Sequence, residues 1–173
     1  MQTRLTKEFF SRDVLAVAPD LIGKQLIVNL GKPNLQSHVI TEVEAYRGEE
    51  DKACHACKGK TKRTEIMYRE GGCLYIYLIY GMYWMLNIVT GEAENPQAVL
   101  IRGILGFNGP GKLCRELGIT GVLNGENITT SNQIWLAEGP VKHVGYSTHP
   151  RIGIDYAGDY WKNKPWRFLI NNS

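Results

Sequence analysis

The stretch Cys73-Leu-Tyr-Ile-Tyr-Leu-Ile-Tyr-Gly-Met-Tyr-Trp-Met-Leu-Asn-Ile-Val89 carries the strongest structural signal in this chain of 173 residues. Aromatic and β-branched residues dominate it, and these residue types favour strands. Gly81 stands where a tight reversal would fall. We therefore predict two antiparallel strands joined by a turn around Tyr80 to Tyr83. With Gly81 and Asn87 interrupting it, the run is too short and too mixed to span a bilayer.

Weaker signals lie on both sides of this hairpin. A threonine N-cap at Thr6 precedes apolar residues at helical spacing, which predicts a helix limited by Pro19. A short helix is predicted over 112–117, with Gly118 as its stop. Further strands are predicted at 25–30, 37–44, 98–103, 133–136, 151–154 and 166–170. Together these elements predict an α+β fold: one curved, mainly antiparallel sheet with a protruding hairpin and a few surrounding helices. Without a visible linker or repeat, 1–173 is expected to be one domain.

The composition is that of an ordinary soluble protein, with 43% hydrophobic and 21% charged residues. Charges crowd the first 13 residues, where a signal peptide needs an apolar stretch, so we expect an intracellular protein, in the cytoplasm or nucleoid if bacterial. The net charge of +3 does not by itself indicate nucleic acid. A basic cluster permits such a partner, although most basic runs are simply solvated faces: Lys58, Lys60, Lys62 and Arg63.

Four cysteines need an interpretation because Cys54 and Cys57 form a C-x-x-C pair. A structural zinc site would need a second close pair of ligands, and neither Cys73 nor Cys114 has one at ligand spacing. A thioredoxin-like pair normally follows a strand at the start of a helix, whereas this pair follows an acidic turn. We therefore expect free thiols and no metal, with zinc or redox chemistry at this pair as the alternatives.

Glu44 stands at the end of a predicted strand whose residues alternate. Val39, Thr41 and Val43 are expected on one face, and His38, Ile40, Glu42 and Glu44 on the other. A carboxylate where a strand meets a loop can project into a cleft from a rigid base. Taken alone, this position more often holds a solvent-facing glutamate.

The tip of the predicted hairpin is unusual because bulky side chains stand where polar residues are expected. Tyr80 and Tyr83 flank Gly81 and Met82. One interpretation is packing against the domain's own core. The other is a wedge that enters DNA between base steps and unstacks them. A protein with such a wedge also needs aromatic walls for the extruded base, for which the candidates are Tyr46, His55, Tyr75 and Tyr77.

Arg102 ends an apolar strand directly before Gly103. Because arginines in buried strands are usually paired, a carboxylate such as Glu44 is its expected partner. The segment Gly109-Pro-Gly-Lys112 precedes a helix, so backbone N–H groups and Lys112 could meet a phosphate there. Its spacing is not that of a P-loop.

These pieces together resemble one family, the alkyladenine (3-methyladenine) DNA glycosylases. The resemblance runs from about residue 5 to residue 170. The stretches that carry it are Glu42-Val-Glu-Ala-Tyr-Arg-Gly48 with His55 behind it, Leu74 to Tyr83 running to Asn87, Val99-Leu-Ile-Arg102, Gly109-Pro-Gly-Lys-Leu-Cys114, Arg151-Ile-Gly-Ile154 and Lys164-Pro-Trp-Arg-Phe168.

The resemblance implies a monofunctional hydrolase without a cofactor. It flips alkylated or deaminated purines out of double-stranded DNA and leaves an abasic site, and it is expected to act as a monomer away from membranes. Glu44 resembles the general base that activates water. Arg102 resembles the arginine that orients this water and the base, and Ile152 stands where the family lends a backbone carbonyl to the water.

The resemblance also assigns residues that bind the DNA. Tyr46, His55 and Tyr77 correspond to side chains that stack around the flipped base. Asn87 corresponds to the asparagine whose bulk disfavours the exocyclic amine of normal guanine, and Tyr80 to the residue that fills the gap left in the duplex. The expected contacts to the DNA backbone are Lys112, Met82 and Tyr83.

Two features depart from the family pattern. Only five residues separate Gly103 from Gly109, where family members usually carry a longer and partly basic insert, so a backbone contact or lid is expected to be missing. Lys62 stands where the family often has proline. Two other classes compete with the glycosylase: a non-catalytic nucleic-acid-binding module using the same wedge, and a zinc or redox protein built on Cys54 and Cys57.

Overall fold

The computed structural model describes residues 3–171, and the predicted hairpin is present in it. Strand β3 (Leu74–Ile79) pairs with β4 (Tyr83–Thr90) in antiparallel register. At the tip, the N–H of Met82 donates to the carbonyl of Ile79 at 3.0 Å, and both intervening residues, Tyr80 and Gly81, have positive φ angles of 50° and 65°. These angles are those of a type I′ turn, whose twist matches that of the flanking strands.

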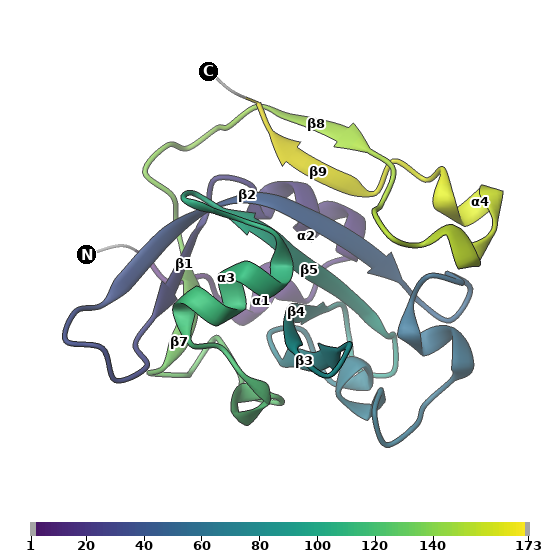
Figure 1. Cartoon of the computed structure of the whole chain (residues 1–173), viewed down its shortest axis with the longest axis horizontal. Coiled ribbons are helices and arrows are strands. Elements are labelled where there is room, and N and C mark those ends of the chain that lie inside the picture. The colour runs from purple at the N-terminus through teal and green to yellow at the C-terminus, as the bar shows by residue number, and fades with distance from the viewer. Residues whose placement is uncertain (1–2, 172–173) are drawn as a thin grey trace.

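Within residues 3–171, nine strands form one sheet in which all pairings are antiparallel (Figure 1). The main path runs β3-β4-β5-β2-β1-β7. Strand β6 pairs with β5, while β8 pairs with β9, which in turn pairs with β2. The remaining bounds are β1 Gln25–Val28, β2 Gln36–Arg47, β5 Gln97–Ile104, β6 Phe107–Asn108, β7 Ile134–Ala137, β8 Tyr146–His149 and β9 Arg167–Ile170. The α+β prediction is confirmed.

Strand β2 is the longest strand of the sheet and contains a bulge. It pairs with β1 through residues 36–39 and with β5 through residues 40–47, and the register shifts on both sides of Glu42. Because a bulge shifts the alternation of side chains, Ile40 joins Val43 and Ala45 in the hydrophobic core. The predicted placement of Ile40 on the face of Glu44 is therefore wrong.

The predicted N-terminal helix is two helices, α1 (Lys7–Phe10) and α2 (Val14–Leu21). The carboxylate of Asp13 accepts a hydrogen bond from the N–H of Leu15 at 2.9 Å, and this cap starts the second helix. Pro19 lies inside α2 instead of ending it. Helix α3 (Pro110–Leu117) ends at Gly118, which has the left-handed conformation that the prediction required. Helix α4 spans Asp159–Lys162, and the described residues also form the 3₁₀ helices η1 His55–Lys58, η2 Glu65–Tyr68, η3 Gly121–Leu123 and η4 Asp155–Ala157.

One hydrophobic core joins the sheet to its helices. Helix α2 packs against β2 and β5, and α3 packs against β4 and β5. The largest fully buried side chains include Phe10, Leu21, Leu86, Ile101 and Leu117. Among residues 3–171, no helix combines the length and apolar character needed to cross a membrane.

The segment 151–154 is not a strand, contrary to prediction. The strand of this region is β8, which ends at His149. Arg151 is instead a buried charged residue, and the backbone N–H of Ile152 donates to a side chain. The backbone of this segment is therefore held by side-chain contacts and not by a neighbouring strand.

Candidate active site

Glu44 is fully buried on β2, opposite Leu100 of β5 and Arg167 of β9. Both of its carboxylate oxygens accept hydrogen bonds. The hydroxyl of Tyr46 donates to Oε2 at 2.7 Å, and the N–H of Ile152 donates to Oε1 at 2.7 Å. The interpretation of Glu44 as a solvent-facing residue at a strand end is therefore wrong. Each carboxylate oxygen has two acceptor sites, so capacity remains for a further donor such as water.

Arg102 lies between two carboxylates. Its Nε is 3.6 Å from Oε1 of Glu44 and 3.3 Å from Oε1 of Glu42, which also accepts from Nη1 of Arg167 at 3.0 Å. The predicted pairing of Arg102 with a carboxylate is thus present. Burial raises the pKa of Glu44, while the charge of Arg102 and the N–H of Ile152 oppose this rise. The arrangement gives a buried, oriented carboxylate of the kind that acid–base chemistry uses.

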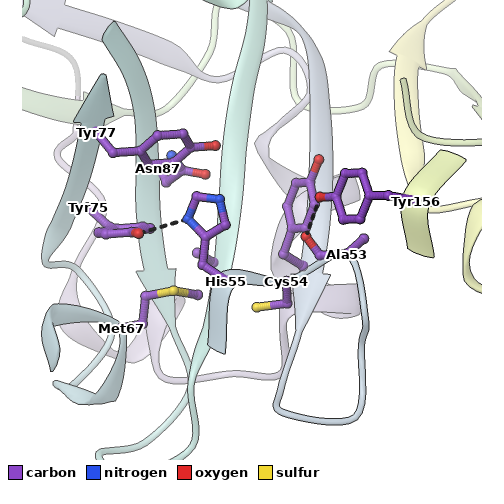
Figure 2. Close-up of a pocket in the computed structure, with 10 residues that line it drawn as sticks. Ala53, Cys54, His55, Met67, Tyr75, Tyr77, Asn87 and Tyr156 are labelled. Carbon is purple, nitrogen blue, oxygen red and sulfur yellow. Dashed lines mark hydrogen bonds between the residues drawn. The ribbon is translucent and has the colours of Figure 1, made fainter. Parts of the chain in front are cut away.

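Beside this carboxylate lies a cavity of about 50 Å³ that opens to solvent. Figure 2 shows Tyr75, Tyr77 and Asn87 on one side of this cavity, and Tyr156 with Ala53 across from them. The complete lining is Tyr46, Ala53, Cys54, His55, Met67, Tyr75, Tyr77, Asn87, Ala98 and Tyr156. All four residues predicted to bind a base, and the further candidate Tyr75, therefore lie around one space.

His55 begins the 3₁₀ helix η1 and joins the aromatic side of the cavity. Its Nδ1 is 2.8 Å from the hydroxyl of Tyr75, and its ring centre is 4.6 Å from that of Tyr77. Burial lowers the pKa of His55 to about 4, and the nearby charges of Arg63 and Lys58 act in the same direction. The imidazole is therefore neutral at neutral pH and does not repel a cationic ligand.

Tyr46 connects the cavity to Glu44. Its ring lines the cavity and its hydroxyl holds the carboxylate, whereas Glu44 does not line the cavity. The two-residue spacing on β2 places both side chains on one face of the strand. A ligand in the cavity would contact Tyr46 while the carboxylate is shielded from bulk solvent behind it.

Tyr80 and Met82 at the hairpin tip are mostly exposed, so the interpretation that they pack on the domain's own core is wrong. The exposed fractions are 87% for Tyr80, 64% for Met82 and 42% for Tyr83. Tyr80 also has a φ of 50°, which is uncommon for a bulky residue and is often found at functional sites. Along β3, Tyr80 is three residues from Tyr77, or about 10 Å. The tip thus lies close to the cavity.

Lys112 lies next to this tip. A Cβ atom at Gly111 would come within 2.9 Å of the Tyr83 ring, so the first turn of α3 packs against the hairpin. The side chain of Lys112 is exposed and forms no ion pair with any residue in 3–171. A free cation beside exposed aromatic groups is suited to a phosphate.

Two features of the site were missed from the sequence. Tyr156 lines the cavity, and its hydroxyl donates to the carbonyl of Ala53 at 3.3 Å. Arg151 and Asp51 form a buried ion pair near Tyr46. Both Arg151 and Asp51 lie in or beside stretches that carry the family resemblance, but no local pattern indicates that they meet.

The cysteines do not form a metal centre in the described part of the chain. All four are free, and Cys54 and Cys73 are buried while Cys57 is exposed. Within residues 3–171, no group of three or more His, Cys, Asp or Glu side chains could hold a metal ion. Cys54 lines the aromatic cavity, and burial raises the pKa of its thiol to about 12.

The site combines an aromatic cavity with a buried carboxylate, and Tyr46 contacts both. A family model described as methylpurine-DNA glycosylase matches residues 8–107 and 105–173. The two matched parts meet within the segment from Gly103 to Gly109, where the sequence predicts a shortened insert.

Similar proteins cover nearly the whole chain. A protein of Desulfitobacterium hafniense is 41% identical over 98% of this chain and 96% of its own length. One from Methanocella arvoryzae is 42% identical over 98% of this chain and 93% of its own, and one from Rickettsia felis 43% identical over 97% and 93%. Each bears the name "Putative 3-methyladenine DNA glycosylase".

The chain therefore belongs to the methylpurine-DNA glycosylase family, and it is a hydrolase of the DNA glycosylase class. This finding favours the enzyme over the non-catalytic nucleic-acid-binding module.

Proposed function

We propose that this protein flips alkylated or deaminated purines out of duplex DNA and hydrolyses the N-glycosidic bond, leaving an abasic site. The observation that carries this proposal is the link through Tyr46, whose ring lines an aromatic cavity and whose hydroxyl holds the buried carboxylate of Glu44. We further propose that one domain acts as a monomer inside the cell, where its DNA substrate is found.

The chemistry requires a carboxylate. Cleavage of an N-glycosidic bond builds positive charge on the sugar, so an ionised group near the sugar and an aligned water both lower the barrier. Glu44 would serve both needs, and Arg102 would orient the water. Ile152 would lend its carbonyl to the same water, which is supported by the contact of its own N–H with Glu44. A lyase would need a lysine at the sugar carbon, and the cavity lining contains none.

The cavity would select damaged purines by stacking. Tyr46 and Tyr77 offer electron-rich faces, and cation–π attraction to an alkylated, cationic purine contributes about 0.5–2 kcal/mol per ring. His55, neutral at neutral pH, adds a third face without repulsion. Asn87 is buried in the cavity wall, where its bulk would disfavour the exocyclic amine of guanine. A neutral lesion such as hypoxanthine would depend on stacking and on being easier to unpair.

The hairpin tip would hold the duplex open. Tyr80 would occupy the gap left by the flipped nucleotide, and its exposure and proximity to Tyr77 support this role. Met82 and Tyr83 would contact the DNA backbone on one side of the wedge, together with Lys112 of α3.

The test is excision from an oligonucleotide duplex that carries a single hypoxanthine or ethenoadenine, followed by alkaline cleavage. The wild-type protein should leave an abasic site without cutting the strand, and Glu44→Gln should bind the duplex but release no base. Glu42→Gln is the matched control, because Glu42 contacts the same arginine but neither Tyr46 nor Ile152. If Glu44→Gln stays active, or the wild-type protein is inert on several damaged purines, the proposal is wrong.

A further inference from the structure

Arg151 and Asp51 form an ion pair in which both side chains are fully buried. The contact is bidentate: Nη1 is 2.6 Å from Oδ2 and Nη2 is 2.9 Å from Oδ1. Removing two charges from water offsets much of their attraction, so such a pair contributes little net stability. Its paired, planar hydrogen bonds do fix direction, however. We therefore expect the pair to fix the positions of neighbouring groups more than to stabilise the fold.

The guanidinium of Arg151 contacts the part of β2 that directly follows Glu44. Nη1 also donates, at 2.9 Å, to the carbonyl of Ala45. Ala45 is the residue after Glu44 on β2. The guanidinium carbon lies 4.8 Å from the centre of the Tyr46 ring and 5.0 Å from that of Trp166. Arg151 thus contacts both the strand that carries Glu44 and the ring that holds its carboxylate.

The carboxylate of Asp51 binds two backbone N–H groups, one at the end of β2 and one in the segment that follows it. Its Oδ2 accepts from the N–H of Arg47 at 3.0 Å, and its Oδ1 accepts from the N–H of Ala53 at 3.0 Å. Ala53 lies two residues before His55, and both line the cavity. The ion pair therefore joins the end of β2 to the cavity wall and to the loop that presents Ile152.

We propose that Arg151 and Asp51 are a positioning pair that holds the N–H of Ile152 and the ring of Tyr46 against Glu44. The inference rests on the proposed role of Glu44 as the base. Arg151 precedes Ile152 in the chain, so anchoring its guanidinium restrains the backbone that carries the Ile152 N–H. Neither Arg151 nor Asp51 lines the cavity, so both act through the residues that they hold.

Arg151 has an electrostatic effect on Glu44 as well. The charged and titratable groups that face Glu44 are Arg102 on β5, Arg151 in the loop and the phenol of Tyr46. Tyr77 lies farther away, Glu42 lies on the other side of Arg102, and Arg167 of β9 pairs with Glu42. The positive charge of Arg151 favours the ionised carboxylate and so lowers the pKa of Glu44. Loss of that charge should move the acidic limb of the rate profile to higher pH.

The experiment compares Arg151→Lys, Arg151→Gln and Asp51→Asn with the wild-type protein in single-turnover excision of hypoxanthine from duplex DNA. Enzyme is in saturating excess, and rates are corrected for the folded fraction. We expect each variant to lose about 100-fold in rate, the scale of a misplacement near 1 Å, with duplex affinity little changed. Amide exchange at Ile152 should become faster while that at Val99 in β5 does not. The acidic limb should move further in Arg151→Gln than in Arg151→Lys.

Two controls separate positioning from general stability. Leu136→Ala removes core packing in β7, and Arg47→Lys disturbs a second Arg–Asp pair, with Asp13, at the end of the same strand. The proposal is overturned if the variants, Asp51→Asn included, lose no more rate than these controls at equal folded fraction, or if the acidic limb and Ile152 exchange stay in place. Glu44→Gln is tested in parallel. Should it remain active, the proposed base is wrong, whereas an inactive Glu44→Gln beside active Arg151 variants refutes the positioning pair alone.

Discussion

Replacing Tyr80 with glycine should stabilise the free protein and impair its action on duplex DNA. Tyr80 has a φ of 50° and a side chain that is 87% exposed, so its conformation is costly and its packing contributes little. A left-handed conformation costs an L-residue about 1–2 kcal/mol. The greater freedom of glycine in the unfolded chain offsets about 0.5–1 kcal/mol of this. We therefore expect the free energy of unfolding to rise by about 0.5–1 kcal/mol, measured by urea denaturation.

The same substitution should lower excision from duplex DNA. Stacking of an aromatic side chain on a base contributes about 1–3 kcal/mol, which corresponds to roughly 5- to 150-fold in the population of flipped nucleotide. Single-turnover excision of hypoxanthine from duplex DNA should fall within this range. Excision from a single strand should change much less, because there the nucleotide leaves no gap in a duplex to be filled.

Two control variants separate the effect of losing the Tyr80 ring from the effect of relieving its backbone strain. Tyr80→Ala keeps the positive φ but loses the ring, so it should lose as much duplex activity as glycine without the gain in stability. Leu105→Ala removes an exposed apolar side chain at the turn between β5 and β6 and should leave both measurements unchanged. Equal losses on duplex and single-stranded DNA, or wild-type duplex rates in Tyr80→Gly, would refute the reasoning.

Burial raises the pKa of Glu44 above its ordinary 4.5, so the stability linked to this group is present at low pH and lost as the pH rises through the folded value. Glu44→Gln should therefore be at least as stable as the wild-type protein at pH 7, with the difference in urea midpoint shrinking below about pH 4. The pKa of His55 is lowered from 6.5 to about 4, so stability should fall as the pH drops through this window. An NMR titration should find the His55 imidazole neutral at pH 6, and His55→Asn should abolish that part of the pH dependence. Lys112→Ala should weaken binding to damaged and undamaged duplexes alike, and lower the slope of log affinity against log salt by about one.

The hairpin could be predicted because its determinants are local. Strand-forming residues fill β3 and β4, and Gly81 allows one of the two positive φ angles that the turn requires. Helix α3 was likewise marked by Gly109-Pro110 before it and Gly118 after it. The sequence also placed Arg102 beside a carboxylate, because an arginine in an apolar strand needs a partner.

The errors arose where distant segments decide the outcome. The bulge in β2 depends on its pairing with β5, so a regular alternation put Ile40 on the wrong face. The segment 151–154 has the composition of a strand, yet the ion pair of Arg151 with Asp51, 100 residues away, holds it in another conformation. By contrast, the prediction of the first helix was wrong for a local reason, because Asp13 caps a separate second helix, which continues through Pro19.

Several features of the site are costly for the folded protein, and this cost is itself informative. A carboxylate buried at Glu44 has a raised pKa, Tyr80 has a strained conformation, and Met82 exposes apolar surface beside it. Local preference alone would select a neutral residue, a glycine and a polar residue at these positions. These costs occur at the carboxylate and at a tip about 10 Å along β3 from the aromatic cavity. Costly features without a common role would be spread over the whole sheet. Removal of a base from a duplex instead needs a wedge, a cavity and a carboxylate within the reach of one nucleotide.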